Sequence, residues 1–413
     1  MAPAVRRGRD RAEEARSEPD LSRFGEPVWE GRGVSGADVV RALAARTAPA
    51  APAPGDPEGA GPGRGAMRAS SLTLVVFAPD RPALERSMAT VAHVAGRHPA
   101  RVILVAPDPD ASPEGLDARI RVEGHARAGA PIVRYEEVVL TMRRVASRHL
   151  ASLVGALLVQ ELPVFLWHLG VLPWGRTWQS EWAETVDRLI VDSAAAPDPL
   201  EDLDSLSILV AAGPAFGMGD MAFQRLRPWR AGVADLFEAE ERRALLDRVD
   251  GVEIAHPGPG GPTAGALLLA GWLRGALGWG KVRVGGADYV VCEREGGDVR
   301  IVFSTVDDDT ALTRASGVSG VTVYLRVDGP QGAAVLEPRA DGLAWTWETD
   351  GRDPAGSGRF AARPVEEAEA LARSLDLAPD PVFEASLDGA AAMARALRHV
   401  AEAVEGGETE AWQ

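Results

Sequence analysis

The sequence predicts an α/β protein: a doubly wound, mainly parallel Rossmann-like sheet, followed by an α+β C-terminal domain with an antiparallel sheet. Up to about residue 280, apolar runs rich in β-branched residues alternate with amphipathic helical segments, which is the pattern of parallel strands joined by crossover helices. After that point, short alternating segments are separated by Gly and Asp, as in antiparallel sheets. This change in pattern predicts two folded units.

The same patterns divide the chain into four regions. Residues 1–34 are expected to form a disordered tail, because charged residues dominate and large apolar side chains are scarce. Residues 35–66 are expected to hold a short helix, capped by Ser35, and then a linker of Pro, Gly and Ala. Residues 67–280 form the predicted α/β domain, and residues 281–413 form the predicted α+β domain.

The first folded unit begins with a continuous apolar strand, LTLVVFA at 72–78, and a helix with Pro82 in its first turn. A second apolar strand, RVILVA at 101–106, completes a crossover unit, and the pattern then repeats. Further strands are expected at 118–123, 132–142, 162–168 and 187–193, and helices at 81–96, 144–160, 178–185 and 200–209.

The second half is expected to begin with a mostly helical segment from residue 220 to residue 249. A strand at 252–256 then leads through the turn HPGPGGPTAG, which lacks the spacing of a phosphate-binding loop, to an apolar helix at 263–277. Later strands are expected at 282–293, 298–304, 320–327, 333–338 and 343–348, and helices at 365–375 and 381–404.

Composition excludes several classes of function. The net charge of -16, from 60 acidic and 44 basic residues, disfavours binding to nucleic acids and anionic membranes. No apolar run is long enough to span a membrane and no signal peptide is visible, so we expect a cytoplasmic protein. The single cysteine, Cys292, argues against an intrachain disulfide and a Cys-rich zinc site. Neither a metal nor a cofactor is expected, because no ligand pattern for one is present.

The segment DMAFQRLRPWRAGVADLF, residues 220–237, stands out in this acidic chain. It groups Arg225, Arg227 and Arg230 around Trp229. Guanidinium groups pair with carboxylate or phosphate and stack on indole rings, so these four residues are candidates for contact with a partner or a phosphate. The alternative interpretation is a buried helical stripe, interrupted at its proline, with the arginines in solvent.

Polar residues at the ends of two predicted strands form a second candidate site. His168 ends one strand, and Asp192 with Ser193 ends the next; ligands of doubly wound sheets bind beyond these carboxyl ends. Trp167 and Trp174 lie in the same stretch and complete the candidate pocket, although core tryptophans are the alternative. The sequence has no GxSxG motif to place a nucleophile, so polar caps of turns remain the alternative for the other three residues.

Six stretches carry a more specific combined pattern: LTLVVFAPD (72–80), GRHPARVILV (96–105), LPVFLWHLG (162–170), DRLIVDS (187–193), DMAFQRLRPWRAGVADLF (220–237) and LLLAGWLRGALGW (267–279). In order and spacing they resemble the OpcA family of glucose-6-phosphate dehydrogenase assembly proteins. The most specific parts are RLRPWR at 225–230 and GWLRGALGW at 271–279.

The resemblance implies a non-catalytic assembly factor or allosteric activator that binds glucose-6-phosphate dehydrogenase and supports the oxidative pentose phosphate pathway and NADPH production. It makes the arginine and tryptophan segment a candidate docking element or sugar-phosphate sensor. Relatives often carry a cysteine where this chain has Tyr135, so thiol control is not expected. The alternative, from the residues alone, is a sugar-phosphate-binding enzyme or sensor that uses the strand-end pocket.

Overall fold

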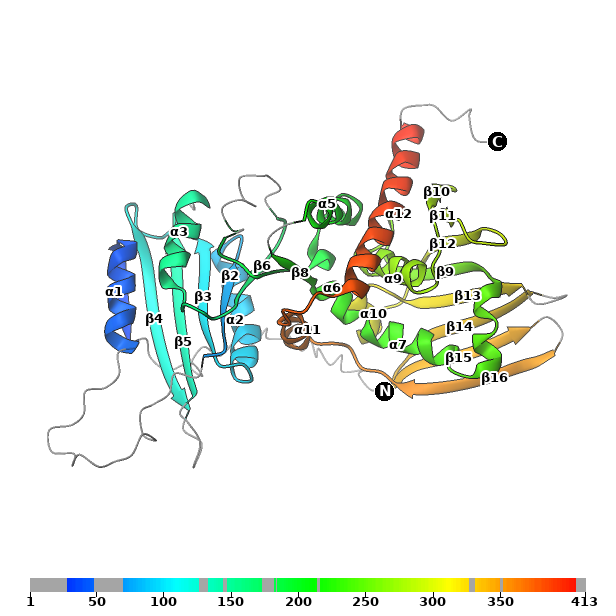
Figure 1. Cartoon of the computed structure of the whole chain (residues 1–413), viewed down its shortest axis with the longest axis horizontal. Coiled ribbons are helices and arrows are strands. Elements are labelled where there is room, and N and C mark those ends of the chain that lie inside the picture. The colour runs from blue at the N-terminus through cyan, green and yellow to red at the C-terminus, as the bar shows by residue number, and fades with distance from the viewer. Residues whose placement is uncertain are drawn as a thin grey trace, which may run out of the picture.

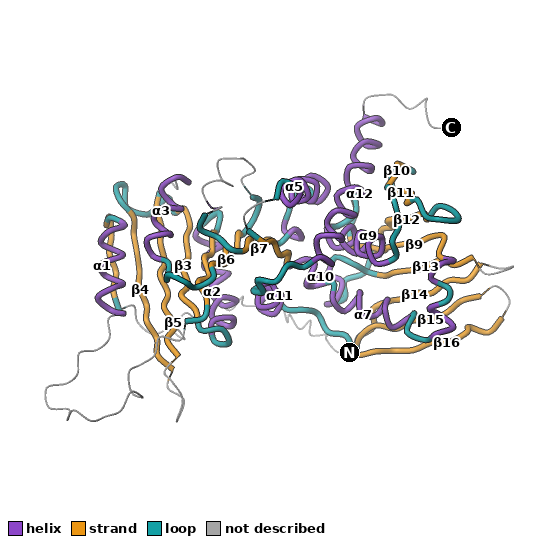
Figure 2. The backbone as a smooth tube through the Cα atoms, in the orientation of Figure 1, coloured by secondary structure: helices purple, strands orange, loops and turns teal. Residues whose placement is uncertain are grey.

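The computed structural model describes residues 28–47, 70–125, 133–143, 147–172, 182, 184–213, 216–326, 331–349 and 352–405. These residues form two eight-stranded sheets, which follow one another along the long axis of the molecule (Figure 1). Helices lie against both sheets, and the long C-terminal helix crosses between them (Figure 2). The linker predicted within residues 35–66 falls mostly outside the described residues.

The first sheet contains the strands that the apolar runs predict, with two additions. Its strands are β1 (Trp29–Val34), β2 (Leu72–Phe77), β3 (Ala100–Pro107), β4 (Leu116–His125), β5 (Val133–Met142), β6 (Val164–His168), β7 (Arg188–Val191) and β8 (Gly217–Asp220). Its helices are α1 (Gly36–Thr47), α2 (Arg81–Ala95), α3 (Ser147–Leu157) and α5 (Pro199–Ala211), and η2 (Ser193–Ala195) is a single 3-10 turn. Strands β1 and β8 were not expected from the sequence.

The order of these strands is β1-β4-β5-β3-β2-β6-β7-β8. The six strands from β5 to β8 in this order are mutually parallel, whereas β4 and β1 join antiparallel at one edge. Numbered by their succession along the chain, the parallel strands run 3-2-1-4-5-6, which is the order of dinucleotide-binding Rossmann sheets. The predicted mainly parallel Rossmann-like sheet is therefore confirmed.

Helices pack on both faces of this sheet. Side chains of alternate residues point to opposite faces, so Val75 and Ile103 share one core with α1, α3 and α5. Leu74 and Val102 share the other core with α2. Because both faces are covered, the central strands read as continuous apolar runs, which is why the sequence identified them.

Strand β1 corrects the prediction that residues 1–34 form a disordered tail. It pairs antiparallel with β4 at the edge of the first sheet, and Trp29 packs against the core. A short edge strand with one large apolar side chain has almost no sequence signal, because its stability comes from hydrogen bonds to a distant partner. Residues 1–27 lie outside the described part of the chain.

The second sheet has the order β10-β11-β12-β9-β13-β14-β15-β16. Its strands are β9 (Val249–Pro257), β10 (Val282–Val284), β11 (Tyr289–Cys292), β12 (Val299–Val306), β13 (Gly320–Arg326), β14 (Gln331–Arg339), β15 (Gly342–Thr349) and β16 (Arg352–Ala361). The helical segments of this half of the chain are α6 (Met221–Arg225), α7 (Arg227–Leu236), α8 (Glu240–Arg243), η3 (Leu246–Arg248), α9 (Ala264–Ala276), α10 (Ala311–Ser316), α11 (Glu367–Ser374) and α12 (Pro381–Glu405). Of these, α11 packs with α2 on the first sheet.

The middle of this sheet differs from the prediction. Strand β9 was expected in the unit of residues 67–280, yet it lies at the centre of the second sheet, between β12 and β13. It runs parallel to β12, so the sheet is mixed. All the remaining pairs of neighbouring strands in this sheet are antiparallel. The reason is the buried helix α9, which forms a crossover that returns the chain beside β9. A sequence pattern identifies both elements but not the sheet that they join.

Helices α9 and α12 approach closely because glycines face each other where they cross. A side chain at Gly271 would clash with the backbone of α12, and one at Gly389 would clash with the backbone at Gly271. Among the described residues, no helix is long and apolar enough to cross a membrane.

Two buried ion pairs join the strands at the centre of the first sheet. Arg101 of β3 donates to Glu136 of β5 at 2.8 and 2.6 Å and to the Leu157 carbonyl at 2.6 Å, and both charged side chains are at most 9% exposed. Arg121 of β4 pairs with Glu137 of β5 at 3.2 Å. These pairs fix which residues lie opposite each other, because an uncompensated charge at this depth is costly.

We expect Glu136→Ala to lower the free energy of unfolding by about 3–5 kcal/mol, because it leaves the buried Arg101 guanidinium without its carboxylate. Urea unfolding curves measure this loss. Replacing both partners, as Arg101→Met with Glu136→Leu, should restore most of the stability. As the matched control, Asp298→Ala removes a half-exposed partner of Arg283 and should cost about 0–1 kcal/mol. A small effect for Glu136→Ala would show that the buried pair is not needed.

Candidate functional site

The segment 220–237 forms two helices. Helix α6 ends at Arg225, Leu226 lies between the helices, and α7 begins at Arg227. The sequence predicts an interruption at Pro228, and the structure places it at Leu226. Because proline has no N–H to donate, it is best tolerated in the first turn of a helix, so the new helix starts just before it.

Trp229 and Leu226 are core residues. Both are fully buried, and the Trp229 indole N–H donates to the Ser316 hydroxyl of α10 at 2.9 Å. Ser316 in turn donates to the Leu312 carbonyl at 2.7 Å. The tryptophan therefore joins α7 to α10, and its place in the predicted contact surface is wrong because its ring has no access to solvent. For this residue the buried-stripe interpretation holds.

The three arginines have three different environments. Arg225 is mostly buried, and its Nη1 donates to both carboxylate oxygens of Asp192 at 2.7 and 2.8 Å. Arg230 lies over the Phe223 ring, with 3.9 Å from Cζ to the ring centroid, and burial lowers its pKa to about 10. Arg227 is exposed at the start of α7. Of the predicted contact residues, Arg227 is thus fully available to a partner and Arg230 partly so.

The predicted strand-end pocket does not assemble as one site. The Ser193 hydroxyl donates to Asp220 at 2.6 Å, and Asp192 pairs with Arg225. His168 is buried and stacks on Phe77, with ring centroids 5.0 Å apart, and burial lowers its pKa to about 4.

His168 contacts Phe77, whereas the Ser193 hydroxyl is hydrogen-bonded to Asp220. These residues therefore do not form a Ser-His-Asp arrangement. Trp167 of β6 is fully buried in the core that α2 shares with the first sheet, so it does not line a pocket. Trp174 lies outside the described residues.

Asp220 is the residue at this edge that sequence reasoning missed. It is fully buried at the end of β8 and caps α6 by accepting the Ala222 N–H at 2.8 Å. Ser193 donates to it through both its hydroxyl and its N–H. Burial, with the nearby charge of Asp192, raises the pKa of Asp220 to about 7 against the hydrogen bonds, which lower it. An aspartate just before a helix is an N-cap signal, and it could have been recognised.

The turn after β2 occupies the place where a Rossmann sheet binds phosphate. The switch point lies between β2 and β6, where Phe77 and His168 are neighbours. The turn reads APDRP and has no glycine. Asp80 caps α2 by accepting the Ala83 N–H at 2.7 Å. A carboxylate therefore already fills the helix N-terminus that a dinucleotide pyrophosphate would need.

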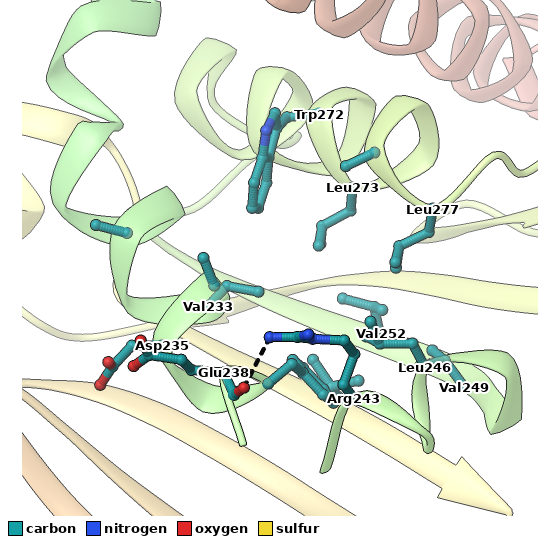
Figure 3. A pocket seen from close by; sticks show the side chains of 15 residues that line it. Val233, Asp235, Glu238, Arg243, Leu246, Val249, Val252, Trp272, Leu273 and Leu277 are labelled. Carbon is teal, nitrogen blue, oxygen red and sulfur yellow. Dashed lines mark hydrogen bonds between the residues drawn. The ribbon is translucent and has the colours of Figure 1, made fainter. Parts of the chain in front are cut away.

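An apolar pocket of about 650 Å³ lies between α7 and α9, above strands β9 and β13 (Figure 3). Trp272, Leu273 and Leu277 form one wall and Val233 faces them across the opening. Asp235, Glu238 and Arg243 line the side of the pocket opposite that wall. Arg243 donates to the Glu238 carbonyl at 2.9 Å. This lining suits an apolar group, since polar atoms are few.

Metal chemistry has no geometric support in the described ranges, where no group of three or more His, Cys, Asp or Glu side chains could hold an ion. Cys292 is buried in β11, and burial raises the pKa of its thiol to about 11. With this pKa the thiol is protonated at neutral pH. The thiolate is the reactive form of cysteine, so Cys292 has little reactivity under these conditions.

Two family descriptions match this chain in succession. The N-terminal domain described for a glucose-6-phosphate dehydrogenase subunit matches residues 91–208, and the corresponding C-terminal domain matches residues 216–387. Together the two matches cover more than half of the 413 residues. The first ends and the second begins close to β8, where the structure passes from one sheet to the other.

Curated relatives of the chain carry the name OxPP cycle protein OpcA. The one from Nostoc punctiforme is 29% identical over 230 residues, which are 54% of this chain and 47% of the relative. The one from Synechocystis is 26% identical over 200 residues, 46% of this chain and 39% of the relative. The matched part thus spans less than half the length of each relative.

Solved structures with a similar fold include an oxidoreductase from Sinorhizobium meliloti, with a TM-score of 0.45 and 12% identity over 80% of this chain and 97% of that one. Another is biliverdin reductase from Synechocystis in complex with biliverdin and NADP+, with a TM-score of 0.39 and 8% identity. That match covers 79% of this chain and 99% of the other.

We expect Trp229→Ala to destabilise the protein by about 3–5 kcal/mol, because it leaves a cavity between α7 and α10. Arg227→Ala, two positions away on an exposed site, should change stability by less than about 0.5 kcal/mol. Chemical unfolding of both variants makes the comparison. Equal stability of the two would contradict the buried position of Trp229.

Opposite to the contribution of His168, whose pKa is lowered by burial, the stability that Asp220 contributes should fall as pH rises from about 4 to about 7. Its folded pKa lies above the usual 3.8, so the folded state holds a proton that the unfolded state releases across this range. The loss is on the order of 4 kcal/mol and is complete above about pH 7. Asp220→Asn lacks this titration, so unfolding curves of variant and wild type should diverge with rising pH, in favour of the variant. A pH-independent difference would mean that Asp220 titrates normally.

Proposed function

This chain belongs to the OpcA family of glucose-6-phosphate dehydrogenase assembly proteins, and we propose that it is a non-catalytic assembly factor or allosteric activator of that dehydrogenase. In this role it binds the enzyme in the cytoplasm and supports the oxidative pentose phosphate pathway. The family supports the choice of partner, because both matching domains are described as parts of a glucose-6-phosphate dehydrogenase subunit.

The observation that carries the non-catalytic part is the filled phosphate position after β2. In a dinucleotide-binding sheet, glycines let the pyrophosphate approach the backbone, and free N–H groups at the helix start receive it. Here Pro79 and Pro82 flank Asp80, whose carboxylate accepts the Ala83 N–H. A nucleotide phosphate would meet a negative charge and lack donors. A sheet with this strand order, in which a carboxylate occupies the phosphate position after β2, is better suited to binding an enzyme than to oxidising a substrate.

The contact that we assign to the partner is centred on Arg227, with Arg230 beside it. Arg227 is exposed and lies close enough to Arg230 to add to the lowering of its pKa, which is caused mainly by burial and opposed by the charge of Asp380. The two guanidinium groups form a small basic surface. Such a surface attracts a carboxylate or phosphate. Activation requires that the chain bind the active form of the dehydrogenase more tightly than the inactive form.

The alternative function, a sugar-phosphate-binding enzyme or sensor at the strand ends, has less support. Asp192 and Ser193 are occupied by Arg225 and Asp220, and His168 is buried against Phe77. Titration calorimetry of the chain alone with glucose 6-phosphate and with 6-phosphogluconate separates the two functions. Binding of either compound in the absence of the dehydrogenase would favour the sensor.

Mixing the purified chain with the glucose-6-phosphate dehydrogenase of the same organism tests the proposal directly. We expect the two proteins to elute together in size-exclusion chromatography. We also expect the dehydrogenase to reach half its maximal rate at a lower glucose 6-phosphate concentration. Unchanged kinetics with the partner at saturation would sink the activator role, and separate elution would sink the assembly role.

Arg227→Glu should weaken the complex about tenfold, which corresponds to about 1.4 kcal/mol, because it reverses the charge at the assigned contact. The same change should leave the fold intact. A glutamate at the first residue of α7 interacts more favourably with the helix dipole than an arginine does. The matched control is Arg86→Glu on the exposed face of α2, which makes the same charge change away from the site. Equal binding by both variants would contradict the assignment.

A further inference from the structure

The second sheet has one face covered by helices and one face without them. The covered, inner face carries residues such as Ile254, Ile301 and Val321, which are at most 1% exposed. Helix residues meet this face: Gly232 of α7 lies against Leu336, and the Phe237 ring packs edge-on against Trp347 at 5.8 Å.

Residues at the alternate positions of β9 and β11–β15 point the other way. We call this surface the outer face. Two cross-strand rows at its centre are Tyr289-Val302-Glu253-Thr322-Val335-Thr346 and Val291-Arg300-Gly251-Tyr324-Ala333-Glu348. Apart from the buried Gly251, the residues in these rows are exposed or half-buried, in contrast to the inner face. Within the described part of the chain, this face is therefore open to solvent.

The outer face has the chemistry of an interface. Its middle combines small and β-branched residues, among them Val302, Val335 and Ala333, with Tyr324 and the carboxylate of Glu253. Charged residues flank the middle on its two sides, with different signs. Arg300 of β12 lies on the Tyr289 ring, 3.8 Å from its centroid, and Glu348 of β15 stands at the opposite side. An open sheet of this size, with apolar side chains among its polar ones, is a typical site of association.

Tyr324 of β13 lies at the middle of the outer face, between carboxylates on β9 and β15. Its hydroxyl donates to Glu253 at 2.9 Å. Burial, the hydrogen bond to Glu253 and the charges of Glu253 and Glu348 raise the pKa of Tyr324 to about 12. Tyr324 is thus a neutral donor between two carboxylates, and its row offers a negative surface next to the small Ala333.

The size of the face matches that of a stable interface. Eight strands spaced at about 4.8 Å, each presenting about six residues at about 3.4 Å per residue, give a surface of about 800 Å². A specific interface buries about 800 Å² on each partner. A smaller protein segment would cover only part of such a flat surface, whereas a second sheet of the same dimensions would cover all of it.

We propose that two copies of this chain associate through their outer faces, about a two-fold axis that runs along the strands between β9 and β13. This axis exchanges β12 with β14 and β11 with β15 between the copies. It places Arg300 of each copy over Ala333 of the other, between Tyr324 and Glu348. The opposite charges meet twice, once on each side of the axis, which is the self-complementarity that a two-fold dimer requires.

The dimer is independent of the proposed binding to the dehydrogenase. Arg227 belongs to α7, which lies on the inner side of the second sheet, so the outer face and the basic surface can be occupied at the same time. Each test can therefore fail without the other.

Sedimentation velocity of the full chain alone, across about 0.1–100 μM, should show a dimer of twice 43.6 kDa, since interfaces of this size reach micromolar or tighter affinity. Val335→Arg, at the centre of the outer face, should convert it to a monomer. Ile208→Arg is the matched control, because Ile208 is 62% exposed on α5 of the first sheet and should leave the dimer unchanged. Circular dichroism melting confirms that both variants are folded.

A charge exchange tests the geometry even if Val335→Arg fails to fold. Arg300→Glu alone and Glu348→Arg alone should each raise the dissociation constant at least tenfold, because each brings like charges together. The double variant should return the constant to near its original value. This rescue is expected from the two-fold arrangement and not from a general loss of stability.

Three outcomes would overturn the proposal. The chain could stay monomeric at the highest concentration, the dimer could persist in Val335→Arg, or the double charge variant could fail to recover association. If the chain is monomeric and Val335→Arg loses binding to the dehydrogenase, the outer face belongs to that enzyme and the self-association is wrong.

Discussion

The connection between the two sheets depends on the buried carboxyl group of Asp220. This residue ends β8 and begins α6, so the chain leaves the first sheet at the same point where it accepts hydrogen bonds from Ser193 and Ala222. A fully buried carboxyl group is tolerated only when its oxygens are satisfied, and these donors come from the end of β7 and the start of α6. One turn later, Arg225 returns to Asp192 and fixes α6 against the same strand ends.

The C-terminal helices fasten the sheets a second time. Glu367 of α11 accepts the Thr90 hydroxyl of α2 at 2.9 Å, and Arg188 of β7 donates to the Ala378 carbonyl at 3.1 Å. Arg395 and Arg398 of α12 both pair with Asp204 of α5. At the carboxyl ends of β7 and β8, where Rossmann proteins bind ligands, Asp192 and Asp220 instead take part in the connection between the two sheets. What remains for recognition is on the surface: the basic start of α7, and the outer face of the second sheet.

This arrangement changes the meaning of the arginine and tryptophan segment. The sequence shows four residues of the type that anchors interfaces. Two of them, Arg225 and Trp229, make internal contacts instead: Arg225 holds α6 against Asp192 after β7, and Trp229 holds α7 against α10. Their partners are far away in the sequence, with Ser316 lying 87 positions from Trp229. A pattern of residue types cannot separate a buried guanidinium from an exposed one when the carboxylate that neutralises it comes from another strand.

The sequence by itself determined the elements whose signal is local. Strands β2, β3 and β6 are apolar runs because both of their faces are buried, and α1 begins at Ser35 because its hydroxyl and Asp38 cap each other. Family membership also followed from short stretches. Only the tertiary structure decided the rest: that β1 is a strand, that β9 joins the second sheet, and that Asp220 is buried. It also decided that Arg227 is the exposed member of its cluster, whereas Arg225, Trp229 and Arg230 are buried or half-buried. These features depend on hydrogen bonds and burial between segments far apart in the chain, and no local pattern of residues encodes which distant segment will be the partner.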